Sequence, residues 1–206
     1  MAKIKKPSFY AEPEKTRFDR LPDQDRYDNL LFENETFPDC TGKRFSECIF
    51  GRDIIRTDMS GSIFTDVIFT HCDLSGVSFA KSEFRRVRFE NCRMGGADFT
   101  ECLFSDTEFT ASQCRYVNFS ASSWKNSVFS DTDFTEGYFS QTSFKTMVIH
   151  HCCFDRTEWL HTPMAGLDVS DSSINGIAVT PENLKGLTVN EAQALACVEL
   201  LGLKIR

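Results

Sequence analysis

SIFTD VIFTH CDLSG VSFAK SEFRR VRFEN, residues 62–91, divides into six units of five residues, and the third residue of every unit is apolar. The same spacing runs without a slip from Met59 to Val179, over twenty-five positions, of which fourteen hold Phe. A period of five fits neither the 3.6-residue turn of a helix nor the two-residue alternation of a strand. It indicates a repeat structure in which each unit forms one short side of a coil.

A second register lies two residues before the first and holds mostly small residues, such as Val67, Cys72 and Ala97. In an extended segment, positions two apart point to the same side. Late in the chain the earlier residue is large and the central one is β-branched, in the pairs Met147 with Ile149, Leu167 with Val169 and Ile177 with Val179. Because close-packed cores conserve volume, this compensation predicts that both registers point inward.

Units such as CDLSG (residues 72–76) and ADFTE (residues 97–101) resemble the consensus of the pentapeptide-repeat family, A/C-D/N-L/F-x-x. The resemblance implies an all-β fold, a right-handed quadrilateral β-helix with four pentapeptides per turn. Twenty-five units then give about six coils at about 4.8 Å, a rod roughly 30 Å long.

The chain divides into three expected segments. Residues 1–30 are rich in charge and Pro and are predicted to form a loosely docked arm. Residues 31–180 form the β-helix, and the nine-residue step from Phe50 to Met59 predicts irregular first coils with a bulge. Residues 181–206 form a short helical cap, because a solenoid needs its exposed core covered at each end.

The C-terminal cap carries two helix-start signals. Thr180 precedes Pro181, which suits a helix N-cap and first turn, and Asn190 with Gln193 resembles a capping box. The second helix, from Glu191 to Leu201, is apolar nearly all round, whereas a cap needs one apolar face. The surplus predicts a symmetric homodimer, with the interface at Leu195, Val198, Leu201, Leu203 and Ile205.

Composition limits the compartment and the partners. The net charge of −7 and the pI near 5.1 argue against nucleic acid and membrane surfaces as partners, since both select basic proteins. No apolar run reaches the ~20 residues of a membrane-spanning helix, and no apolar stretch follows the basic N-terminus as in a signal peptide. We therefore expect a cytoplasmic protein, whose nine Cys are reduced thiols.

Acidic residues concentrate on two sides of the predicted rod. Residues 57–180 hold sixteen Asp and Glu against nine Lys and Arg. The side through Phe69 and Phe89 is assigned −4, and the side through Phe79 and Phe99 is assigned −3. The predicted partner-binding residues are seven of the nine acids on these sides, Asp58, Asp98, Glu101, Glu108, Asp131, Asp168 and Asp171.

Enzymatic and metal chemistry are not expected. The run His150-His151-Cys152-Cys153 lacks the ligand spacing of a zinc site, and the register points only Cys152 inward. Inward Cys residues are interpreted as small apolar fillers, and the acidic pairs lie on a convex surface without a cleft. We predict no catalytic residue, no metal and no cofactor.

The rod and the tail together, including GLD (residues 166–168) and VTPENLKG (residues 179–186), resemble the quinolone-resistance (Qnr-type) pentapeptide-repeat proteins, in particular their loop-free Gram-positive branch. The resemblance implies a dimeric, DNA-mimicking acidic rod that binds DNA gyrase or topoisomerase IV and protects it from quinolones, giving antibiotic resistance. The alternative is a scaffold for another cytoplasmic protein, because an acidic surface is also the ordinary state of a soluble protein.

Overall fold

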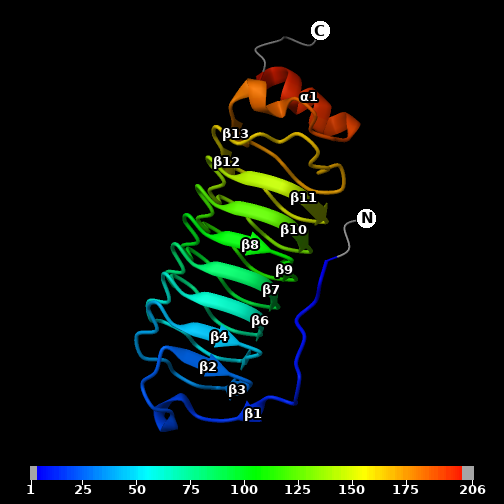
Figure 1. Cartoon of the computed structure of the whole chain (residues 1–206). Helices are drawn as coiled ribbons and strands as arrows, with labels where there is room; N and C mark the ends of the chain where they lie inside the picture. Colours follow the sequence, from blue (N-terminus) through cyan, green and yellow to red (C-terminus); the bar gives the residue numbers. More distant parts are fainter. Residues whose placement is uncertain (1–3, 201–206) are drawn as a thin grey trace.

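The computed structural model describes residues 4–200, which form one long rod of parallel coils with a helix at its C-terminal end (Figure 1). The strands are β1 (Glu14–Lys15), β2 (Arg26–Asp28), β3 (Leu30–Glu33), β4 (Arg44–Ser46), β5 (Ile49–Gly51), β6 (Ile63–Thr70), β7 (Glu83–Glu90), β8 (Leu103–Ser105), β9 (Glu108–Thr110), β10 (Ser123–Ser130), β11 (Ser143–His150), β12 (Glu158–Trp159) and β13 (Ala178–Val179). The helices are the 3₁₀ helices η1 (Phe18–Arg20) and η2 (Pro181–Leu184) and the α-helix α1 (Glu191–Leu200). In this part of the chain no helix has the length and apolarity needed to cross a membrane.

One coil of the rod takes twenty residues. Strand β6 pairs in parallel with β7, so that Phe64 lies beside Phe84, and β10 pairs with β11 at the same offset. Four units of five residues therefore make one turn. The chain is a right-handed quadrilateral β-helix of about eight turns with a short C-terminal helix, which confirms the predicted fold class.

The four sides of the rod are named here by one central residue each. In chain order they are the Phe79 face, the Phe64 face, the Phe69 face and the Leu74 face, and their central residues recur every twenty positions along the regular coils. Sides whose central residues are ten positions apart lie opposite each other in a four-sided coil. The Phe79 face is therefore opposite the Phe69 face.

The core is a set of stacked rings along each face. The rings of Phe64 and Phe84 are fully buried, with centroids 5.0 Å apart and planes 5° from parallel. Val67, in the second register, is also fully buried, and so are both members of the compensating pair Leu167 and Val169, at 2% and 1% exposure. Both registers thus point inward as predicted. Each stacked pair adds about 0.5–1.5 kcal/mol beyond the burial of its rings.

The chain turns each corner with a left-handed residue. Two residues after the central position φ is positive in coil after coil, and within residues 4–200 the twenty-two non-glycine residues with positive φ have values from 49° to 62°. His71 and Ala111 are examples, and Gly76 and Gly96 fill the same position elsewhere. An L-residue in this region costs roughly 1–2 kcal/mol. The corners therefore require the buried stack and the ladder to hold them.

The first coils are one or two residues shorter than the rest. Phe45 pairs with Phe64 at an offset of nineteen, and Tyr27 pairs with Phe45 at an offset of eighteen. Ile55 is fully buried and fills the central position between Phe50 and Met59. The predicted bulge is therefore wrong: a bulge adds a residue to a strand, whereas these coils are shorter than twenty.

The N-terminal end of the rod is closed by an aromatic side chain. Phe18, on η1, places its ring centroid 5.1 Å from those of Tyr27 and Phe37, the central residues of the first coil. Strand β1 pairs with β3 beside this end. Ladder and core contacts thus reach into the segment predicted as an arm, and its described residues 4–13 precede the first strand.

The C-terminal end is covered by α1. Its predicted capping box is confirmed, because the Gln193 N–H donates to Asn190 Oδ1 at 3.0 Å and the Asn190 N–H donates to Gln193 Oε1 at 2.8 Å. Gln193 Nε2 also donates to the carbonyls of Val169 and Ser172, which ties the helix to the last coil. The segment after Thr180 is a 3₁₀ helix without a side-chain cap.

The ladder opens after β11 on two faces. The N–H of Ser143 donates to the Ser122 carbonyl one coil below, but the equivalent residue one coil above is Pro163, which has no N–H. Within the described residues no strand pairs with β11 from the coil above, although the Met164 N–H still donates to the Asn183 carbonyl of the next coil, as central residues elsewhere do. A cleft of about 260 Å³ results, lined by Met147, Val148, Ile149, His150, Gly166, Asp168, Ser170 and Asp171.

One inward position carries a carboxylate. Asp53, two residues before Ile55, is fully buried in a register that holds neutral residues along the regular coils. Its Oδ1 accepts the Glu35 N–H at 2.7 Å, and its Oδ2 has no hydrogen-bond partner in the described part of the chain. Burial raises the pKa of Asp53 to about 6, and the Glu35 carboxylate adds to this effect.

We expect Asp53→Ser to stabilise the rod in a pH-dependent way. The folded pKa of Asp53 lies above the unfolded value of 3.8, so its buried charge destabilises the fold progressively from about pH 4 to pH 6 and fully above pH 6. The difference of about two pKa values corresponds to at most about 3 kcal/mol. Urea unfolding should show the gain at pH 8 and little of it at pH 4. An equal gain at both pH values would contradict the explanation.

Candidate partner-binding surface

The seven acids predicted to bind a partner fall on opposite sides of the rod. Asp58, Asp98 and Glu101 belong to the Phe79 face, whereas the other four belong to the Phe69 face, namely Glu108, Asp131, Asp168 and Asp171. Ten residues, or half a coil, separate the two faces. The structure therefore does not bring the seven together, and a flat partner would contact one group or the other.

Several of these aspartates hold the turn of their own unit. Asp58 Oδ1 accepts the Ser60 N–H at 2.7 Å, and Asp168 Oδ1 accepts the N–H of Ser170 at 3.0 Å and its hydroxyl at 2.6 Å. The bond from the Ser170 hydroxyl lowers the pKa of Asp168. Asp98, also in the predicted set, makes the same contact with Thr100, and the contact recurs outside the set in the pairs Asp39 with Thr41, Asp73 with Ser75 and Asp133 with Thr135. The Asp of the repeat thus has a local structural role.

Two further acids of the set have partners on neighbouring coils. Glu108 Oε2 lies 3.1 Å from Arg88 Nε, one coil below. Asp171 accepts the His151 N–H at 3.2 Å and lies 3.2 Å from His150 Nδ1. Burial raises the pKa of Asp171, but its hydrogen bonds outweigh burial and hold the pKa below its usual range.

Within residues 4–200, Glu101 and Asp131 are the unpartnered carboxylates of the set. Both are exposed corner residues with positive φ, and neither side chain has a hydrogen-bond or ion-pair partner within residues 4–200. Glu101 marks the Phe79 face and Asp131 the Phe69 face. Each face therefore offers one carboxylate whose charge can be changed without breaking a contact of the fold.

A further group of acids lies on the corner between the Phe64 and Phe69 faces, at Glu47, Asp66 and Asp106. Sequence reasoning missed this group, because it summed charges by face rather than along corners. The available signal was the spacing of nineteen and forty residues between the three, which matches one and two coils. Backbone N–H groups of the N-terminal segment lie against all three.

The structure confirms the predicted orientation of the run from His150 to Cys153. Cys152 is buried, Cys153 is half-buried, and His150 and His151 are exposed. In residues 4–200, no three His, Cys, Asp or Glu side chains are placed to share a metal ion. The run is thus divided between the core and the surface.

The inward thiols are surrounded by the core. Burial raises the pKa of the Cys102 thiol and of the Cys152 thiol to about 12, so both are protonated at neutral pH. The Cys102 Sγ donates to the Phe79 carbonyl one coil below. These contacts fit the predicted role of small apolar fillers.

We expect two of the nine thiols to react in the native protein. Cys153 and Cys197 are half-buried and the other seven are buried. Titration with Ellman's reagent at pH 8 should therefore reach two equivalents in buffer and nine in 6 M guanidinium. Cys153→Ser should lower the native value to one. Rapid reaction of a third thiol without denaturant would contradict the packing.

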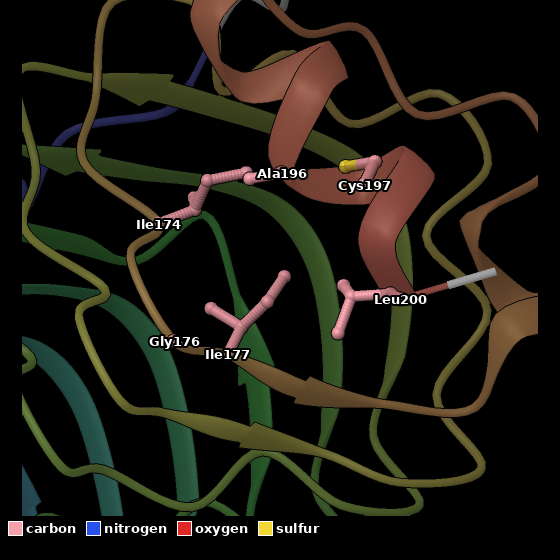
Figure 2. Close-up of a pocket in the computed structure, with 6 residues that line it drawn as sticks. All are labelled: Ile174, Gly176, Ile177, Ala196, Cys197 and Leu200. Carbon is pink, nitrogen blue, oxygen red and sulfur yellow. The ribbon is translucent and has the colours of Figure 1, made fainter. Parts of the chain in front are cut away.

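The predicted dimer segment presents apolar side chains at the C-terminal end. Leu195 is 56% exposed, Leu200 is 39% exposed and Val198 is half-buried. A cleft of about 220 Å³ lies between α1 and the last coil, where Leu200 faces Ile177 (Figure 2); its lining is Ile174, Gly176, Ile177, Ala196, Cys197 and Leu200. The other predicted interface residues, Leu201, Leu203 and Ile205, lie outside the described residues.

Comparison with known families agrees with the coil geometry. Residues 62–136 match the family described as the pentapeptide repeat region. Residues 62–136 are therefore a pentapeptide repeat region. No curated protein sequence matches the chain.

Several solved structures align with much of the chain at low identity and low TM-score. Full-length QnrB1, a plasmid-mediated fluoroquinolone resistance protein, is 22% identical with a TM-score of 0.34, over 92% of this chain and 95% of QnrB1. HetL, a pentapeptide repeat protein involved in heterocyst differentiation regulation in Nostoc sp. strain PCC 7120, is 9% identical with a TM-score of 0.29, over 79% of this chain and 86% of HetL. A pentapeptide repeat protein of the Arabidopsis thaliana thylakoid lumen is 14% identical with a TM-score of 0.22, over 62% and 74% of the two chains. With such low scores, the fold assignment depends on this chain's own coils.

Proposed function

We propose that this chain is a cytoplasmic, non-enzymatic DNA mimic that binds a type II topoisomerase, DNA gyrase or topoisomerase IV, and protects it from quinolones. The observation that carries the proposal is a regular rod whose carboxylates repeat at the coil spacing. The resemblance of the tail, residues 166–205, to the loop-free Qnr-type branch names the partner class.

The density of carboxylates on the rod resembles that of phosphates on a DNA duplex. Sixteen Asp and Glu lie in residues 57–180, which span about 30 Å at about 4.8 Å per coil. This is one carboxylate per about 1.9 Å, against one phosphate per about 1.7 Å of duplex axis. Nine Lys and Arg reduce the net charge of the rod to less than half of this density. A basic DNA-binding groove would still attract such a surface.

A specific observation favours the alternative, a scaffold that binds another cytoplasmic protein. Many aspartates of the rod are explained by the turn of their own unit, as at Asp58 and Asp168. The number of acids on the rod therefore overestimates the number of carboxylates available to bind a partner. The two functions differ in whether a topoisomerase responds to the protein.

Charge reversal at the unpartnered carboxylate of each face, Glu101 or Asp131, tests the proposed DNA mimicry. If one face enters the DNA-binding groove, either Glu101→Lys or Asp131→Lys should weaken relief of ciprofloxacin inhibition in a gyrase supercoiling assay severalfold. The other variant then serves as its control, because the faces are opposite. Lys81 already occupies the corner position of Glu101 one coil below, at φ 60°, so the fold accommodates Lys there.

Two outcomes contradict the proposal at different levels. Full protection by both reversal variants would reject charge mimicry through these two faces. Failure of the unmodified protein to relieve, inhibit or bind gyrase or topoisomerase IV at any concentration would reject the topoisomerase partner and favour the scaffold.

We also propose a homodimer through the C-terminal segment. Leu195→Glu should halve the mass measured by light scattering, because the exposed Leu195 side chain would lose its apolar partner. Leu103→Glu is a matched control, since Leu103 is 54% exposed on the rod surface away from the tail. A monomeric unmodified protein, or an equal effect of both variants, would contradict the interface.

A further inference from the structure

The N-terminal segment lies against the rod and outside its coils. Residues 4–12, called the strap, run alongside the coils from the level of β1 toward that of β9 (Figure 1). Pro7 and Phe9 are half-buried, whereas Lys5 and Lys6 are exposed. The strap thus turns apolar side chains to the rod and its basic side chains to solvent.

The strap follows a single corner of the rod. This corner, between the Phe64 and Phe69 faces, stacks one residue from each of five successive coils, and all five have φ between 52° and 56°. The corner column consists of Asn29, Glu47, Asp66, Arg86 and Asp106. Asp66 also accepts Arg86 at 2.6 and 2.7 Å, which fixes its carboxylate.

Main-chain groups of the strap meet side chains of the corner column in order. The N–H of Tyr10 donates to Glu47 Oε2 at 2.8 Å, that of Ser8 to Asp66 Oδ1 at 3.0 Å and that of Lys5 to Asp106 Oδ1 at 3.2 Å. At the lower end Asn29 Nδ2 donates to the Glu12 carbonyl at 3.4 Å. Four of the five coils thus hold the strap by its backbone.

The spacing of these contacts follows from two repeats. An extended chain rises about 3.3 Å per residue, so the seven steps from Glu12 to Lys5 span about 23 Å. The four coil steps from Asn29 to Asp106 span about 19 Å at about 4.8 Å each. A fully extended strap would thus be about 4 Å longer than the column. The register matches best from Ser8 to Lys5, where three residues, about 10 Å, climb the two coils from Asp66 to Asp106, about 9.6 Å.

We propose that the corner column is a binding track for an extended basic peptide, and that the strap is its built-in occupant. The track accepts the N–H groups of an extended backbone, and its three carboxylates outnumber its one guanidinium, so it fits a Lys-rich or Arg-rich extended segment of another protein once the strap leaves. The proposal does not depend on a topoisomerase as the partner.

The first test measures hydrogen exchange in the full-length protein. The amides of Ser8 and Tyr10 should be protected, and the double variant Glu47→Ala/Asp106→Ala should remove this protection while the amides of β7 stay protected. The matched control, Glu101→Ala/Asp131→Ala, removes the same two residue types from other corners. Ala111 and Ala121 already occupy left-handed corners, so Ala is compatible with the fold at all four positions.

The second test measures binding to an emptied track in the full-length chain. Ser8→Pro/Tyr10→Pro removes two of the three strap donors, because Pro has no N–H. A fluorescent peptide of residues 4–12 should then bind saturably in an anisotropy titration, and Glu47→Ala/Asp106→Ala in the same chain should weaken it about tenfold. A peptide with Lys5→Glu and Lys6→Glu should bind at least as weakly.

Three results would overturn the inference. The strap amides could exchange equally fast in the unmodified protein and in the column variant. The emptied chain could fail to bind the peptide saturably up to millimolar concentration. The peptide could bind equally to the column variant and to the Glu101→Ala/Asp131→Ala control, which would mean attraction to net charge alone. None of these readouts involves a topoisomerase, so they are independent of the proposed function.

Discussion

The left-handed corner is the constraint on which the rest of this structure depends. A four-sided coil turns every five residues, and its corners place non-glycine residues such as His71 and Ala111 at positive φ. Each such residue is unfavourable by itself, roughly 1–2 kcal/mol. Stacked rings, such as Phe69 on Phe89 at 4.9 Å, and the ladder between coils offset this cost only when neighbouring coils are present. Stability is therefore a property of adjacent coils, and the ends need Phe18 and α1 as covers.

Because the inward positions serve the core, recognition is left to three outward positions per unit, and these also have structural duties. The residue before the centre often closes a turn, as Asp98 does with Thr100, and the corner residue must tolerate positive φ. Counting all Asp and Glu residues thus combines carboxylates that stabilise the coil with carboxylates that are available to a partner. Glu101 and Asp131 differ from the rest because their side chains have no partner in the described chain. Composition alone does not show which acids have such partners.

The periodic part of the structure was predictable from sequence, and the aperiodic part was not. A five-residue register identifies Phe64 and Val67 as core because each inward position repeats the same environment. The shortened first coils break that register, so Ile55 was not recognised as a central residue. Pro163 opens the ladder after β11 through a missing N–H that matters only once its neighbour across coils is known. For the candidate site, sequence assigned acids to faces but did not identify their partners.

The strap shows how a repeat fold can create a site that no single unit encodes. One corner position, repeated every eighteen to twenty residues, becomes a column with the spacing of the coils, and three residues of an extended chain, about 10 Å, rise nearly as far as two coils, about 9.6 Å. Main-chain N–H groups then find acceptors at Glu47, Asp66 and Asp106 whatever the side chains of the peptide are. Selectivity must come from charge and from apolar contacts such as that of the half-buried Phe9. A rod of this kind can therefore hold an extended segment on a corner while its faces remain open.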